Sequence, residues 1–86
     1  MQIRSFYRNQ RELAFAINEI IDAYWKEEIL EDEMIEGINK IFVYNSDKIL
    51  KDSEYTKVIQ QQCGKKRLNI ISKVINSNLG RGRDNV

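Results

Sequence analysis

The cations that follow Gly64 are the residues of this chain best suited to binding chemistry. Glycine commonly ends a helix, so Lys65, Lys66 and Arg67 would lie at the start of the next one. Cations and free backbone N–H groups at a helix start bind phosphate well. Residues 55–83 hold no acid, and three glutamines, which can bond phosphates or adenine edges, precede Gly64. We therefore predict nucleic-acid contacts from a set of basic and amide side chains: Lys57, Gln61, Lys65, Lys66, Arg67 and Lys73.

The same cations have other interpretations. They would also balance the negative C-terminal end of the preceding helix, with no ligand involved. Two helices around Gly64 would form a pair similar to a DNA-binding helix-turn-helix. That motif usually has a small residue five positions into its first helix, and here Gln60 stands at about that place. A P-loop is excluded, because Gly64 has no partner glycine upstream and no Ser or Thr follows Lys65.

The composition argues against an enzyme, and we expect no cofactor and no metal. The chain has no histidine, which removes the usual general base and a common metal ligand. Its one cysteine, Cys63, cannot form a thiolate zinc site or an internal disulfide, and we expect it to be buried. Six acids crowd residues 27–36 without the glycine that a calcium loop needs. No apolar run reaches membrane length, so we expect no membrane association and a reducing, cytoplasmic setting.

Apolar spacings of three and four predict an all-α fold, a small bundle of about four helices without strands. The clearest helix covers residues 10–26, with Asn9 as its N-cap and Leu13, Ile17, Ile20 and Tyr24 on its buried face. A second helix begins with acids at residues 31–33, and Asn45 ends it. Residues 45–53 form a connection, and two more helices span residues 54–75. We assign residues 1–76 to a single helical domain and residues 77–86 to a flexible C-terminal tail.

The pattern leaves an alternative open at Gly64. A single apolar stripe could run through it as one continuous helix, which would leave a polar gap after the glycine and cost about 1 kcal/mol relative to alanine. We favour a helix broken at Gly64.

Two segments carry a resemblance to a known family. Residues 12–25 (ELAFAINEIIDAYW) and 54–75 (EYTKVIQQQCGKKRLNIISKVI), with the acidic helix between them, resemble a small uncharacterised helical family of Gram-positive bacteria and their plasmids and phages. The resemblance covers residues 6–76, and its most specific part is residues 55–68. It implies a stand-alone small protein in a mobile-element setting, and it transfers no catalytic or binding residue.

The charge distribution favours a binding module that is not an enzyme. Residues 1–44 carry five basic and nine acidic side chains, a net charge of −4, whereas residues 45–86 carry nine and four, a net charge of +5. An anionic partner for the basic half fits this polarity, and nucleic acid is our leading prediction. The alternative is a protein-interaction factor, such as an inhibitor or adaptor, that uses the acidic surface or aromatic side chains such as Phe15. Halves of opposite charge would also suit a homodimer.

Overall fold

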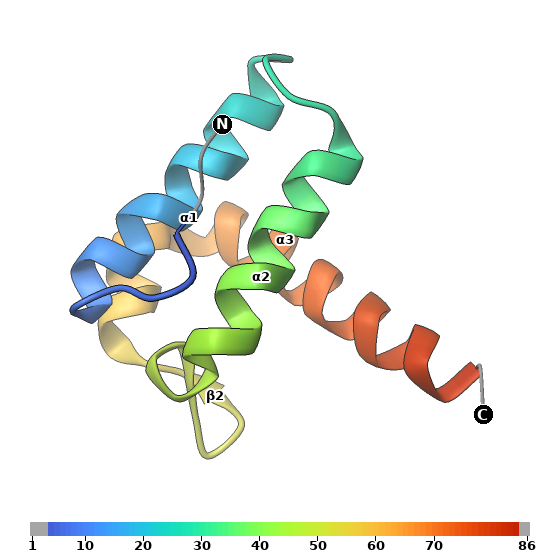
Figure 1. The fold of residues 1–86 in the computed structure, drawn as a ribbon. Coiled ribbons are helices and arrows are strands. Elements are labelled where there is room, and N and C mark those ends of the chain that lie inside the picture. The colour runs from blue at the N-terminus through green and yellow to red at the C-terminus, as the bar shows by residue number, and fades with distance from the viewer. Residues whose placement is uncertain (1–3, 85–86) are drawn as a thin grey trace.

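Three helices and one short hairpin make up the fold. The computed structural model describes residues 4–84, and their side chains over residues 4–76. Figure 1 shows α1 and α2 antiparallel and side by side, while α3 passes behind them and then runs away toward the C-terminus. The elements in chain order are α1 (Gln10–Trp25), α2 (Glu31–Ile49), β1 (Leu50–Lys51), β2 (Glu54–Tyr55) and α3 (Lys57–Asp84).

The predicted all-α bundle of four helices therefore needs correction. The two predicted C-terminal helices are one helix, α3, in which Gly64 alone is non-helical, with φ 81° and ψ 167°. The predicted interruption at Gly64 is confirmed, although it is a one-residue kink. We call residues 57–63 the first arm of α3 and residues 65–84 its second arm. The bounds of α3 reach Asp84, and the flexible tail at residues 77–86 stays a prediction, because residues 85 and 86 lie outside the described part.

Helix α1 follows its sequence signals closely. The side chain of Asn9 accepts a hydrogen bond from the backbone N–H of Glu12 (2.9 Å), which confirms the predicted N-cap. The helix ends one residue earlier than expected, and Glu27 then adopts a left-handed φ of 62°. Three of the predicted face residues, Leu13, Ile17 and Ile20, are buried, and Tyr24 is half-buried. The buried positions recur at helical spacing: Leu13, Ala14, Ile17, Ile20, Ile21 and Ala23.

Asn45 does not end the second helix, contrary to the prediction. It is non-helical (φ −136°, ψ 24°), but α2 continues past it to Ile49. The reason lies in its burial: Asn45 is fully buried, and its amide donates to the carbonyls of Ile41 (2.9 Å) and Ser5 (2.7 Å). The second bond ties the N-terminal arm, residues 4–9, against the kink. A sequence pattern cannot show a contact across 40 residues, so Asn45 reads as a helix end.

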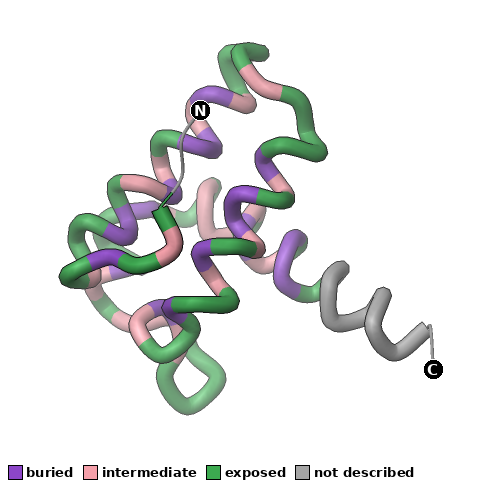
Figure 2. The backbone as a smooth tube through the Cα atoms, in the orientation of Figure 1, coloured by how far each residue is buried: buried purple, intermediate pink, exposed green. Residues whose placement is uncertain are grey.

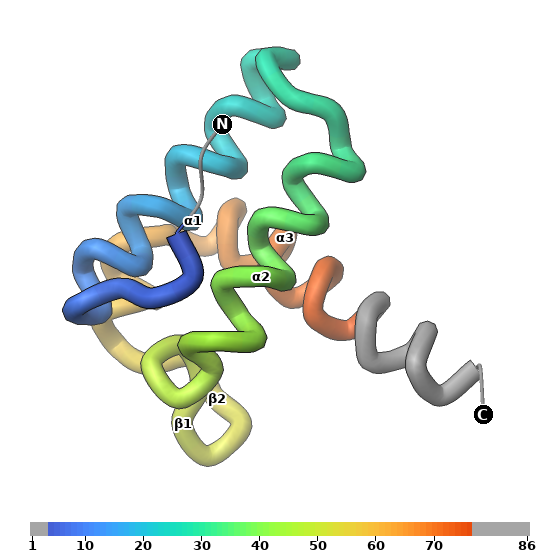
Figure 3. Tube along the Cα trace, in the orientation of Figure 1, coloured from blue at the N-terminus to red at the C-terminus, as the bar shows by residue number. Residues whose placement is uncertain are grey.

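The hairpin between α2 and α3 is a further departure from the prediction. Leu50 pairs with Tyr55 and Lys51 with Glu54, and the two turn residues, Asp52 (φ 53°) and Ser53 (φ 70°), are both left-handed. Two successive left-handed residues match the twist of antiparallel strands. The segment lacks the Asn-Gly or Asp-Gly pair that usually signals such a turn. Figure 3 shows the hairpin at the end of α2 opposite the α1–α2 connection.

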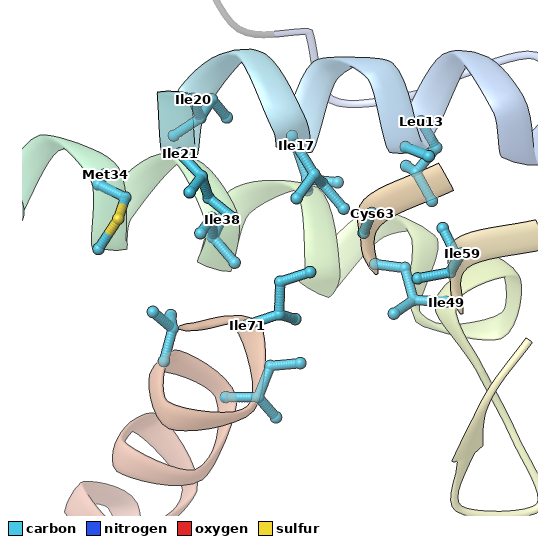
Figure 4. Close-up of a cluster of buried hydrophobic side chains, with 14 of the residues drawn as sticks. Leu13, Ile17, Ile20, Ile21, Met34, Ile38, Ile49, Ile59, Cys63 and Ile71 are labelled. Carbon is cyan, nitrogen blue, oxygen red and sulfur yellow. The ribbon is translucent and has the colours of Figure 1, made fainter. Parts of the chain in front are cut away.

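The core lies where α1, α2 and both arms of α3 meet. Figure 2 places the buried positions on the facing sides of the helices, and Figure 4 shows Ile59, Cys63 and Ile71 of α3 in one cluster with side chains of α1 and α2. Ile59 and Ile71 are fully buried, one on each arm. Both arms are therefore anchored to the same core, which fixes the direction of α3 on each side of Gly64.

Candidate nucleic-acid interface

Most of the predicted contact residues lie exposed on α3. The exposed positions are Lys57, Gln61, Lys65, Lys66 and Lys73. On the first arm, Lys57 and Gln61 are one turn apart and share a side of the helix.

On the second arm, Lys66, Asn69 and Lys73 follow at spacings of three and four, and all three are exposed. At a rise of about 1.5 Å per residue, Lys66 and Lys73 are about 10 Å apart along the axis. We call the exposed residues Lys65, Lys66, Asn69 and Lys73 the basic stripe.

Arg67 does not join the basic stripe. Its guanidinium forms a bidentate pair with Asp22 of α1: Nε to Oδ1 is 3.0 Å, and Nη2 lies 2.8 Å from Oδ1 and 3.1 Å from Oδ2. Nη1 donates to the carbonyl of Cys63 (3.1 Å), and the group lies over the ring of Trp25, 5.6 Å from its centroid. All of these hydrogen bonds go to other groups of the protein, so they are not available to a ligand. The phosphate-binding capacity of this surface therefore rests on the lysines.

The bonds of Arg67 also explain how the kink is held. The last carbonyls of a helix lack intrahelical donors. Two carbonyls directly before Gly64 accept bonds from side chains instead: Asn18 donates to the carbonyl of Gln62 (2.9 Å), and Arg67 donates to that of Cys63. Because Asn18 and Asp22 are one turn apart on α1, that helix holds α3 on both sides of the kink.

Cys63 is confirmed as a buried free thiol, only 2% exposed. Burial raises the pKa of its thiol to about 11, and the nearby Arg67 guanidinium offsets part of that rise. The thiolate is the reactive form, so the thiol is inert at neutral pH. Among the side chains that the structure describes, residues 4–76, no group of His, Cys, Asp and Glu has the geometry to hold a metal ion.

The acids at the start of α2 have a structural role. The carboxylate of Glu33 accepts a bond from the backbone N–H of Leu30 (3.1 Å), which caps the helix start. Acids in the first turn also suit the positive end of the helix dipole. These two effects account for part of the acidic cluster at residues 27–36.

A second surface carries exposed apolar side chains. Phe6 (65% exposed) contacts Tyr44 (50%) with ring centroids 5.3 Å apart, and Val43 beside Tyr44 is 64% exposed. Phe15 of α1, named above as a candidate for protein contacts, is also exposed. The sequence pattern does not reveal the Phe6–Tyr44 pair, because the N-terminal arm reaches α2 through contacts between distant residues, such as the bond from Asn45 to Ser5 and the burial of Tyr7 in the core. None of the helices over the described residues is long and apolar enough to cross a bilayer.

The geometry defines a small, mostly helical domain with cations on one helix. The chain belongs to a family described as a conserved hypothetical protein, whose match covers residues 4–76. The predicted membership of an uncharacterised family is thereby confirmed, while its setting in plasmids or phages stays a prediction. No curated protein and no solved structure matches the chain significantly.

Proposed function

We propose that this protein is a non-catalytic module that binds nucleic acid through the exposed side of α3. One observation carries the proposal: Lys57, Lys65, Lys66 and Lys73 are all exposed on α3, and residues 55–83 contain no acid. Cations along an element without acids give that element a positive potential. The proposal places the protein in the cytoplasm, where nucleic acid is available.

The chemistry of the exposed side suits contacts to the sugar–phosphate backbone. Lysine is a flexible point charge that meets phosphate oxygens without fixed geometry. Such contacts release counterions, so affinity falls steeply as salt rises. Gln61 and Asn69 add amide groups that can bond phosphates or base edges. The one-residue kink at Gly64 is shorter than the three- to four-residue turn of a helix-turn-helix. We therefore do not propose that α3 enters the major groove as the recognition helix of that motif does.

A charge-matched pair of variants tests the proposal. Lys57, Lys66 and Lys73 are replaced together by Gln, and a control variant has Arg8, Arg11 and Lys51 replaced by Gln. The control removes the same amount of charge, but at exposed positions outside α3. Fluorescence anisotropy with labelled duplex and single-stranded DNA, at salt from about 50 to 200 mM, gives the affinity and its salt dependence.

We expect the α3 variant to bind more weakly and with a flatter salt dependence. Removing one phosphate contact reduces the steepness of log affinity against log salt by about 0.9 for duplex and about 0.7 for single strands. The control should keep most of the wild-type slope. No binding of either DNA by micromolar wild-type protein at about 50 mM salt would overturn the proposal, as would equally weakened binding in the two variants.

The exposed apolar surface favours a second candidate function, a protein-interaction factor. Phe6 and Tyr44 contact each other in the folded chain, and both they and the neighbouring Val43 have half or more of their area open to solvent, which is typical of contact surfaces. An inhibitor or adaptor of a mobile element, or a homodimer, fits this surface. Capture of host proteins with and without nuclease separates the candidates: this one requires complexes that resist nuclease and disappear in the Phe6→Ser, Tyr44→Ser double variant.

A further inference from the structure

We propose that Trp25 is a stacking site for an unpaired nucleobase, so that the preferred ligand is a single strand. The inference rests on the proposed function and names the form of nucleic acid that the surface of α3 would take. Neither the core nor the basic stripe explains this side chain. Trp25 ends α1 and is 46% exposed, and it lies outside the buried cluster.

The ring of Trp25 is supported on one face. The Arg67 guanidinium lies over it, and Arg67 is itself fixed by the bidentate pair with Asp22 and by the carbonyl of Cys63. A planar cation over an indole ring is attractive in itself and restricts the motion of the ring. A ring already held in place loses little conformational freedom when a flat ligand stacks on it. The arrangement thus provides a fixed aromatic platform.

The platform lies beside the helical turn that carries Lys65 and Lys66, whose side chains leave the helix on other sides than Arg67 does. Arg67 directly follows Lys65 and Lys66, so the ring that Arg67 touches is adjacent to the first turn of the second arm. Glu27 and Glu28, both exposed, follow Trp25 in the chain and repel phosphates from that direction. A strand would therefore approach from the lysine side and turn a base toward the ring.

A single strand fits this geometry better than a duplex. Bases in a duplex are already stacked on their neighbours, whereas a single strand can present the flat face of a base to an aromatic side chain. Proteins that bind single strands combine a positive track with aromatic stacking positions. The described part of α3 supplies the first feature, and Trp25 supplies the second.

The test uses the intrinsic fluorescence of the protein, because Trp25 is its one tryptophan. Wild type is titrated with oligodeoxythymidine of about 12 nucleotides, a length that a small module can cover, and with a blunt DNA duplex of the same length. We expect saturable quenching of Trp25 by the single strand and tighter binding of the single strand than of the duplex. Trp25→Ala should weaken single-strand binding by about 5- to 150-fold, the range typical of removing one aromatic stacking partner.

Two further variants make the result specific. Trp25→Phe keeps a flat ring and should retain most of the affinity. Phe15→Ala removes an aromatic that is 65% exposed elsewhere on α1, and it should change nothing. Circular dichroism confirms that each variant is folded.

The two proposals fail in different ways. Binding that is equally tight for Trp25→Ala and wild type, or salt-dependent binding without quenching, would overturn the stacking site and leave the role of the lysines intact. Absence of binding to either probe by wild type would overturn both.

Discussion

Gly64→Ala gives the most direct test of the fold, because it separates backbone strain from packing. Gly64 has φ 81° and ψ 167°, a region that residues other than glycine almost never adopt. A Cβ atom built on Gly64 meets nothing within 4 Å. Any decrease in stability must therefore come from the backbone conformation and not from a clash.

The expected size follows from two opposing terms. Holding an L-residue in this region costs about 1–3 kcal/mol. Alanine also restricts the unfolded chain more than glycine does, which stabilises the folded state by about 0.4–1 kcal/mol. We expect Gly64→Ala to lower the free energy of unfolding by about 1–2 kcal/mol. For a domain of this size, each kcal/mol corresponds to a fall in Tm of about 4–8 °C.

Urea unfolding followed by circular dichroism measures this change, and a mirror-image variant provides the control. Gly64→D-alanine, made by chemical synthesis, adds a methyl group of the same size on the other side of the Cα atom and restricts the unfolded chain to the same extent, but it prefers positive φ. The difference in stability between the two alanine variants therefore reports the strain itself, about 1–3 kcal/mol. An L-alanine variant as stable as wild type would refute the reasoning, because α3 would then be free to run straight through residue 64.

The remaining predictions concern the core. Ile17→Ala should cost about 2–5 kcal/mol in urea unfolding because Ile17 is fully buried, whereas Phe15→Ala on the exposed side of the same helix should change stability by less than about 0.5 kcal/mol. A thiol reagent should label Cys63 slowly in the folded protein and quickly in urea, and equal rates would place the thiol at the surface. Because the pKa of Cys63 rises from 9.0 to about 11 on folding, the unfolded chain gives up this proton first. The free energy of unfolding should accordingly fall between pH 9 and 11, and Cys63→Ala should remove the contribution of the thiol to that fall.

Local signals in the sequence predicted most of α1 and the interruption of α3. Asn9 and Glu12 lie three residues apart, and the hydrogen bond between them is decided by that spacing alone. Glycine at position 64 is a similar case, because the conformation it adopts is one that its own lack of a side chain permits. Where one residue or one turn of helix determines the structure, the sequence pattern is sufficient.

The errors arose where distant contacts override a local preference. Asn45 reads as a helix end, yet its bond to the carbonyl of Ser5 places it in the core while α2 continues. Arg67 reads as one more cation of a basic run, yet its partner Asp22 lies 45 residues away. Both side chains are visible in the sequence, but only the packing of the helices chooses their partners. Of the predicted contact residues, the four lysines and Gln61 are exposed, whereas Arg67 is paired with Asp22.

The position of Arg67 has a consequence for recognition. Arginine is the residue that reads guanine or clasps phosphate with two parallel bonds, and here Asp22 already occupies that fork. The exposed lysines attract any phosphate backbone alike, so under the proposed function they supply affinity without sequence preference. Any preference among nucleic-acid ligands would then come from the groups that can contact a base: Gln61, Asn69 and the ring of Trp25. Of these, only Trp25 distinguishes a stacked duplex from an open strand, and it does so because Arg67 supports its ring instead of binding the ligand.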